Sequence, residues 1–176
     1  TGSIRSRMVN QAEKIAADLR MNTSYETKYG SRSINQMLPI VRKQGNAFLA
    51  SQRVHGETFH YFDTGIKRLI IELEMQEFAV FLVHLSLKYR HRHLQLRKLY
   101  DLIAATGDSD VLVIGDLNAY LDEDPILAFE TELHNLVRAY DKDPYSYNFF
   151  ATFAAPWIGR GLLDHAFATP SMAKQV

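Results

Sequence analysis

The sequence contains no cysteine, which excludes disulfide bonds and thiolate metal sites and leaves the cellular compartment open. Its formal net charge is zero, so any surface that binds phosphate must be a local one. No apolar run is long enough to span a bilayer, and the chain does not start with a signal-peptide pattern. The glycine loops that cradle phosphates and the Gly-x-Ser-x-Gly motif of hydrolases are also missing.

The sequence does contain enough apolar material for one globular domain with a sizeable core. It has 176 residues, of which 47% are hydrophobic and 23% are charged. The chain does not begin with methionine, so we expect a processed chain, a tagged chain or a fragment. No internal repeat, low-complexity segment or linker divides it.

Apolar periodicity predicts a mixture of helices and strands. The expected helices cover residues 8–20, 94–105 and 130–141, and the expected strands cover residues 23–29, 45–51, 54–62, 66–74, 78–84, 111–114 and 162–168. Three residues separate the fourth strand from the fifth, so these two should form an antiparallel hairpin. The fifth strand, the second helix and the sixth strand should form a crossover unit of an α/β fold. Asp124 fits an N-cap, with Pro125 at the first position of a further helix.

The most informative segment is residues 111–118, where four aliphatic residues precede Gly115, Asp116, Leu117 and Asn118. Such a run predicts a strand that is buried on both faces, with Asp116 and Asn118 at its carboxyl end. The carboxylate can accept a proton or bind a hard cation, and the amide can donate to a phosphate or a water. If the extended geometry persists, both side chains lie on one side. The alternative interpretation is an Asx turn that follows a strand.

His84 and Asp164 are the other polar residues placed where chemistry is expected. His84 ends an apolar strand as Asp116 does, so the two should share a cleft, although a satisfied core histidine is the alternative. Asp164 lies within an apolar strand, where a carboxylate is costly unless it is paired. Neighbouring His165 should point to the opposite face. The partner of Asp164 is therefore expected to be His84 or a histidine outside this chain.

A basic stretch begins just after His84. It comprises Lys88, Arg90, Arg92, Arg97 and Lys98. Such a stretch could contact a substrate phosphate. Because the charge is balanced elsewhere, an ordinary exposed helix face is the favoured interpretation.

Five short segments, in this order along the chain, resemble motifs of the endonuclease/exonuclease/phosphatase superfamily of metal-dependent, DNase I-like phosphoesterases. They are residues 10–13 (Asn-Gln-Ala-Glu), 45–51 (Gly-Asn-Ala-Phe-Leu-Ala-Ser), 83–85 (Val-His-Leu), 115–119 (Gly-Asp-Leu-Asn-Ala) and 161–167 (Gly-Leu-Leu-Asp-His-Ala-Phe), the last with Arg160 nearby. The resemblance implies an α/β fold, namely a four-layer α/β/β/α sandwich, formed as a single domain over residues 1–176.

Two expected motifs have no counterpart in the sequence. These are the Gln-Glu pair that supplies the main metal-binding glutamate and the closing Ser-Asp-His segment. The resemblance therefore implies a domain that is incomplete at both ends, with weak metal binding and little activity by itself. Sheet edges left open in this way could pair with another copy.

The resemblance also implies a function and a set of site residues. The function is metal-dependent phosphoester hydrolysis by a nuclease, phosphodiesterase or phosphatase that uses Mg²⁺ or Mn²⁺. The implied catalytic residues are His84, Asp116, Asn118 and Asp164. The implied substrate-binding residues are Asn46, His84 and Asn118, and Asp116 is implied as a weak metal ligand. In a rival alignment the catalytic histidine is His165. The implied substrate is a nucleic acid, a nucleotide or a phospholipid headgroup. The alternative function is a non-catalytic binding or scaffold domain with a degenerate site.

Overall fold

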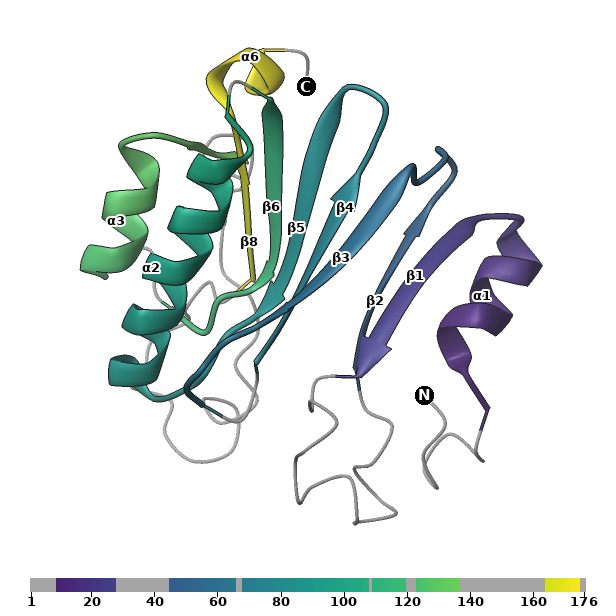
Figure 1. The fold of residues 1–176 in the computed structure, drawn as a ribbon, viewed down its shortest axis with the longest axis horizontal. Helices are drawn as coiled ribbons and strands as arrows, with labels where there is room; N and C mark the ends of the chain where they lie inside the picture. Colours follow the sequence, from purple (N-terminus) through teal and green to yellow (C-terminus); the bar gives the residue numbers. More distant parts are fainter. Residues whose placement is uncertain are drawn as a thin grey trace, which may run out of the picture.

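The computed structural model describes residues 9–27, 45–65, 68–107, 109–119, 123–136 and 164–174 (Figure 1). Its helices are α1 (Gln11–Leu19), α2 (Tyr89–Ala105), α3 (Asp124–Glu130) and α6 (Pro170–Ala173). Its strands are β1 (Asn22–Thr27), β2 (Gly45–Ala50), β3 (Gly56–Tyr61), β4 (Leu69–Glu74), β5 (Phe78–His84), β6 (Asp110–Asp116), β7 (His134–Asn135) and β8 (Asp164–Ala168). No helix in these ranges is long and apolar enough to cross a membrane.

The larger sheet has six strands in the order β3-β4-β5-β6-β8-β7. Strands β4 and β5 pair antiparallel, which confirms the predicted hairpin. Strands β5 and β6 pair in parallel and are joined through α2, which confirms the predicted crossover. Strand β8 then pairs antiparallel with β6 and β7. As a result, the ends of β5 and β6 and the start of β8 lie together at one edge of this sheet. This edge is formed by strand ends and differs from the edge strands β3 and β7.

The smaller sheet consists of β1 and β2, paired antiparallel. Phe48 and Ala50 of β2 pack against one face of the larger sheet, on a cluster that includes Leu73 and Val80. Helix α1 contacts the smaller sheet through an inner face where Ala12 and Ala16 are buried (Figure 1). With α2 and α3 on the far side, the layers follow the order α/β/β/α, as predicted.

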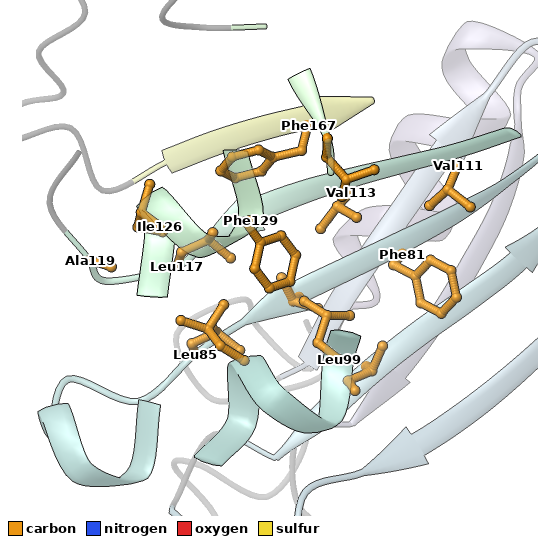
Figure 2. Packing of buried hydrophobic residues seen from close by; sticks show 14 of the residues in the cluster. Phe81, Leu85, Leu99, Val111, Val113, Leu117, Ala119, Ile126, Phe129 and Phe167 are labelled. Atoms are coloured by element: carbon orange, nitrogen blue, oxygen red, sulfur yellow. The ribbon is translucent and has the colours of Figure 1, made fainter. Parts of the chain in front are cut away.

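The helix-facing side of the larger sheet carries the main core. Phe81, Val113 and Phe167 project from β5, β6 and β8 onto Leu99 of α2 and Phe129 of α3 (Figure 2). The same cluster includes Leu85, Leu117 and Ala119, which follow the ends of β5 and β6 and are all fully buried. These three apolar residues anchor the two loops to the core, so the polar residues that alternate with them are held in place.

Four expectations about the elements were wrong. Helix α2 begins at Tyr89 instead of residue 94, because its first turns bury Arg92 and Gln95 in place of apolar residues. The cap of α3 is Glu123, without a side-chain capping bond, instead of Asp124. The predicted helix over residues 130–141 is replaced by β7, within the part that the structure describes. Leu112 and Ile114 are only half-buried, because they face the smaller sheet.

Candidate functional site

The strand register brings three predicted site residues to one edge of the larger sheet. His84 is the cross-strand partner of Asp116, and Asp116 is the partner of Asp164. Side chains alternate along a strand, so these residues lie on the face that carries Leu82 and Ile114. Those two residues pack toward the smaller sheet. His84, Asp116 and Asp164 therefore share one face and one end of three adjacent strands.

His84 and Asp116 are in direct contact. The Nε2 atom of His84 lies 3.1 Å from Oδ2 of Asp116, and 32% and 31% of the two side chains are exposed. A ligand at this edge can therefore reach both groups. His84 is thus not the enclosed core histidine of the alternative interpretation. The pair combines a proton acceptor with an oriented imidazole, which are the components of proton-transfer chemistry.

Asn118, a predicted site residue, is part of an Asx turn. Its backbone N–H donates to Oδ1 of Asp116 over 2.9 Å, which closes the turn. Its Nδ2 donates to the backbone oxygen of Leu85 over 3.0 Å. Asn118 has a φ of 50°, so the extended geometry does not continue past Asp116. Asparagine adopts this left-handed conformation more readily than most residues that carry a side chain.

Gly115 allows β6 to approach β5 directly beside the site. Its φ is 141°, which disfavours any residue with a side chain. A β-carbon here would overlap the carbonyl oxygen of Val83 and would lie 3.0 Å from the carbonyl carbon. Because Val83 and Gly115 immediately precede His84 and Asp116, the glycine permits the close spacing of that pair.

Asp164 differs from its predicted environment. It is the first residue of β8, and its side chain is exposed instead of buried in an apolar strand. The expected desolvation of the carboxylate therefore does not arise, since water reaches it directly. Its position opposite Asp116 nevertheless adds a second carboxylate to this edge of the sheet.

His165 points to the opposite face of β8, as its position in the strand predicts. It is only 3% exposed, and its Nε2 lies 2.8 Å from the backbone oxygen of Ala119. Burial lowers the pKa of His165 below its usual value, against the opposing effects of the Ala119 carbonyl and the carboxylate of Asp164. The buried, neutral imidazole supports the loop after β6. This geometry does not favour the rival assignment of His165 as the catalytic histidine.

Asn46 lies on the smaller sheet. It precedes Phe48 by two positions in β2, so alternation places both on the face toward the larger sheet. Strand β2 begins at the edge where β5 and β6 end (Figure 1). Asn46 is thus placed across from the His84–Asp116 pair, with a half-buried side chain.

The side chains at this edge do not by themselves complete a metal site. No group of three or more histidine, aspartate or glutamate residues that could hold a metal occurs among the described residues. Asp116 offers oxygen atoms of the type that Mg²⁺ prefers, but a hard cation needs several oxygen ligands. The described donors therefore do not fit a complete Mg²⁺ site.

The buried polar contacts below the loops that follow β5 and β6 do not follow from the sequence pattern. Arg92 is not on an exposed helix face as predicted; it is 5% exposed and contacts Glu123 over 2.5 Å. Gln95, which is 1% exposed, accepts a hydrogen bond from the backbone of Ser86. Both residues are strongly polar, so the apolar periodicity that locates buried helix faces gives no indication of them.

These four layers, with polar groups gathered where the strands of the larger sheet end, define the class of DNase I-like α/β proteins. The sequence profile of the Endonuclease/Exonuclease/phosphatase family matches residues 24–176. The chain belongs to this family. No sequence among the curated proteins matches it significantly.

Solved structures share the fold at low sequence identity. An AP endonuclease from Archaeoglobus fulgidus is 18% identical with a TM-score of 0.63, and the match covers 98% of this chain and 85% of that one. The human Nocturnin catalytic domain with bound sulfate is 14% identical with a TM-score of 0.62 and coverages of 92% and 65%. A mannosyl-6-phosphatase from Bacteroides thetaiotaomicron is 15% identical with a TM-score of 0.60 and coverages of 92% and 67%. The chain thus spans about two thirds of the latter two structures.

Proposed function

We propose that the full-length protein is a metal-dependent phosphoester hydrolase whose site lies at the edge where β5 and β6 end. The observation that supports this most directly is the 3.1 Å contact between His84 and Asp116, both half-exposed on one face. Structural neighbours include proteins described as an endonuclease and as a phosphatase, which act on phosphoesters. Family membership and site geometry therefore favour the same class of reaction.

Each residue has a distinct proposed role. Asp116 orients or deprotonates the attacking water, or protonates the leaving group, and its orientation is fixed by the N–H of Asn118. His84 and Asn118 donate hydrogen bonds to the phosphate, whose negative charge grows in the transition state. One hydrogen of the Asn118 amide already binds Leu85, and a primary amide carries a second. Asn46 contacts the substrate from the facing sheet, and Asp164 orients a histidine outside the described residues.

We also propose that activity requires Mg²⁺ or Mn²⁺. A divalent cation supplies charge stabilisation to a phosphoryl group. Asp116 is the proposed ligand from the described part of the chain, with the other ligands supplied from outside it. The 176-residue chain is therefore expected to bind Mg²⁺ weakly and to turn over slowly, and calorimetry of this chain with Mg²⁺ tests that expectation.

The proposal is tested by hydrolysis of bis(4-nitrophenyl) phosphate by the full-length protein with and without Mg²⁺. Asp116→Asn is expected to lower kcat by about 10²- to 10⁴-fold, the usual contribution of a general acid or base. The matched control is Asp110→Asn, at the opposite end of β6, where the carboxylate accepts a hydrogen bond from Thr169 over 2.7 Å. This control should retain the wild-type rate.

Two outcomes would contradict the proposed function. An Mg²⁺-dependent rate that survives both Asp116→Asn and Asn118→Ala would place the site elsewhere. A full-length protein without hydrolytic activity, encoded by a gene that also lacks the Gln-Glu and Ser-Asp-His segments, would support the alternative function of a binding or scaffold domain.

The substrate is proposed only as a class, namely a nucleic acid, a nucleotide or a phospholipid headgroup. Comparing kcat/KM for one member of each class would identify it. Self-association through a sheet edge is a further proposal, since β3 and β7 are the edge strands of the described larger sheet. Sedimentation velocity over a range of protein concentrations tests it.

A further inference from the structure

We propose that Arg92 and Gln95 of α2 are positioning residues that lock the two loops carrying His84, Asp116 and Asn118. This inference rests on the proposed function for its kinetic consequence, but its structural consequence can be measured independently. Neither residue lies on the exposed edge where the site forms. Their role is to hold the backbone that presents the site residues.

Arg92 connects the loop after β5 with the start of α3. Its Nη1 donates to the backbone oxygen of Leu87 over 3.0 Å and to that of Ser86 over 3.4 Å. Its Nη2 contacts the Glu123 carboxylate over 2.5 Å, and both side chains are largely buried. Glu123 is the N-cap residue of α3. One guanidinium group therefore ties the loop after β5 to the start of α3.

Gln95 lies one turn further along α2 and holds the same loop from a second side. Its Oε1 accepts from the backbone N–H of Ser86 over 2.9 Å, and its Nε2 donates to the backbone oxygen of Thr64 over 2.9 Å. Gly65 permits this approach, because a β-carbon there would lie 2.9 Å from Nε2 of Gln95. The segment that joins β3 to β4 is thus bound to the loop after β5.

The loop after β5 is hydrogen-bonded directly to two residues of the proposed site. The backbone N–H of Leu85 donates to the backbone oxygen of Asp116 over 2.9 Å. The backbone oxygen of Leu85 accepts from Nδ2 of Asn118 over 3.0 Å. Fixing Ser86 and Leu87 therefore fixes Leu85, and Leu85 in turn sets the position of Asp116 and Asn118 relative to His84.

Stability alone does not account for this arrangement. Replacing a buried ion pair by well-packed apolar residues is often neutral or stabilising. In addition, Nε of Arg92 is buried without a hydrogen-bond partner in the described part of the chain. Leu99 fills the corresponding inner face of α2 two turns later with an ordinary apolar side chain. The buried polar residues of α2, Arg92 and Gln95, occur where the helix meets the loops that carry the proposed site.

The structural test is amide hydrogen exchange measured by NMR on the 176-residue chain. The reporter is the backbone amide of Leu85, and its exchange rate is divided by that of Val113 in the centre of β6. Global unfolding exposes both amides, so this ratio isolates local opening of the loop. Arg92→Met should raise the ratio about tenfold or more, since hydrogen bonds to a charged group are lost. Arg92→Lys, which keeps the charge but replaces the fork of donors by a single ammonium group, should restore only part of the protection.

The matched control is Leu99→Ala, which destabilises the same helix but removes no hydrogen bond to the loops. It should not raise the ratio, although it lowers the midpoint of unfolding. Gln95→Met, of similar volume, gives a second measurement and serves in place of Arg92→Met if that variant does not fold. A ratio in Gln95→Met or Arg92→Met that matches the ratio in Leu99→Ala overturns the positioning role.

Kinetics on the full-length protein separate this inference from the proposed function. Gln95→Met and Arg92→Met should lower kcat for bis(4-nitrophenyl) phosphate about tenfold or more while KM changes less, because misplaced groups act mainly in the transition state. An inactive wild-type protein with a raised exchange ratio in the variants would refute the function and retain the loop contacts. Active variants with wild-type kcat and a raised ratio would refute the role of the contacts in positioning.

Discussion

Replacing Gly115 by alanine is the substitution whose effect follows most directly from the structure. The φ of 141° would cost a residue with a side chain about 1–3 kcal/mol. Overpacking against the carbonyl group of Val83 adds about 1–3 kcal/mol, because that carbonyl belongs to a central strand and cannot move away. We therefore expect Gly115→Ala to lower the free energy of unfolding by about 2–6 kcal/mol, a large part of the ~5–15 kcal/mol of a typical domain.

Gly107→Ala is a matched control for this measurement. Gly107 also has a positive φ, of 69°, but a β-carbon there would meet no atom within 4 Å. Only the conformational penalty of about 1–2 kcal/mol applies to it. Urea denaturation followed by circular dichroism compares the two variants directly. If Gly115→Ala costs no more than Gly107→Ala, then the close approach of β5 and β6 does not require glycine, and the account of the site geometry fails.

Three further effects are expected from the same structure. Burial lowers the pKa of His165, so the unfolded chain binds a proton before the folded chain does as the pH falls below 6.5. The free energy of unfolding should then decline below that pH by up to about 1.4 kcal/mol per pH unit. Urea titrations at several pH values should show that His165→Gln removes this pH dependence. Asn118→Ala should lower the free energy of unfolding by about 1–3 kcal/mol, because its hydrogen bond to Leu85 is lost. Asn118→Gly should lower it by less, because glycine adopts the positive φ without penalty. Equal losses of stability in thermal unfolding would contradict this. Phe129→Ala should cost about 3–5 kcal/mol, as expected for a ring packed against Phe167, and a loss under 1 kcal/mol in denaturant unfolding would contradict that packing.

Most of the fold could be predicted from the sequence because apolar periodicity reports which face of an element is buried. The β4–β5 hairpin and the parallel pairing of β5 with β6 follow from such patterns. The start of α2 could not be predicted in this way, because Arg92 and Gln95 take buried positions through hydrogen bonds. Strand β7 could not be predicted from its own sequence either, because it forms by pairing with β8, which is distant in the chain.

The placement of the candidate site residues at one edge could be predicted in part from the ends of the strands. His84 and Asp116 each end an apolar strand, so parallel pairing was enough to bring them together. The Asx turn, predicted as the alternative to a site, is present at Asn118, and it does not preclude the proposed site role because Nδ2 of the same residue is bonded separately to Leu85. The exposure of Asp164 depends on where β8 begins, which its apolar neighbours do not reveal.

The position of β8 between β6 and β7 has a consequence for synthesis on the ribosome. Residues 78–116 contain both partners of the β5–β6 pairing, so the β5-α2-β6 unit can form once this stretch has emerged. Strand β7, in contrast, is separated by residues 136–163 from its only described neighbour, β8, so it leaves the exit tunnel before β8 does. The nascent chain therefore exposes one side of β6 until β8 emerges, and this interval is when a chaperone or a neighbouring nascent chain can bind there.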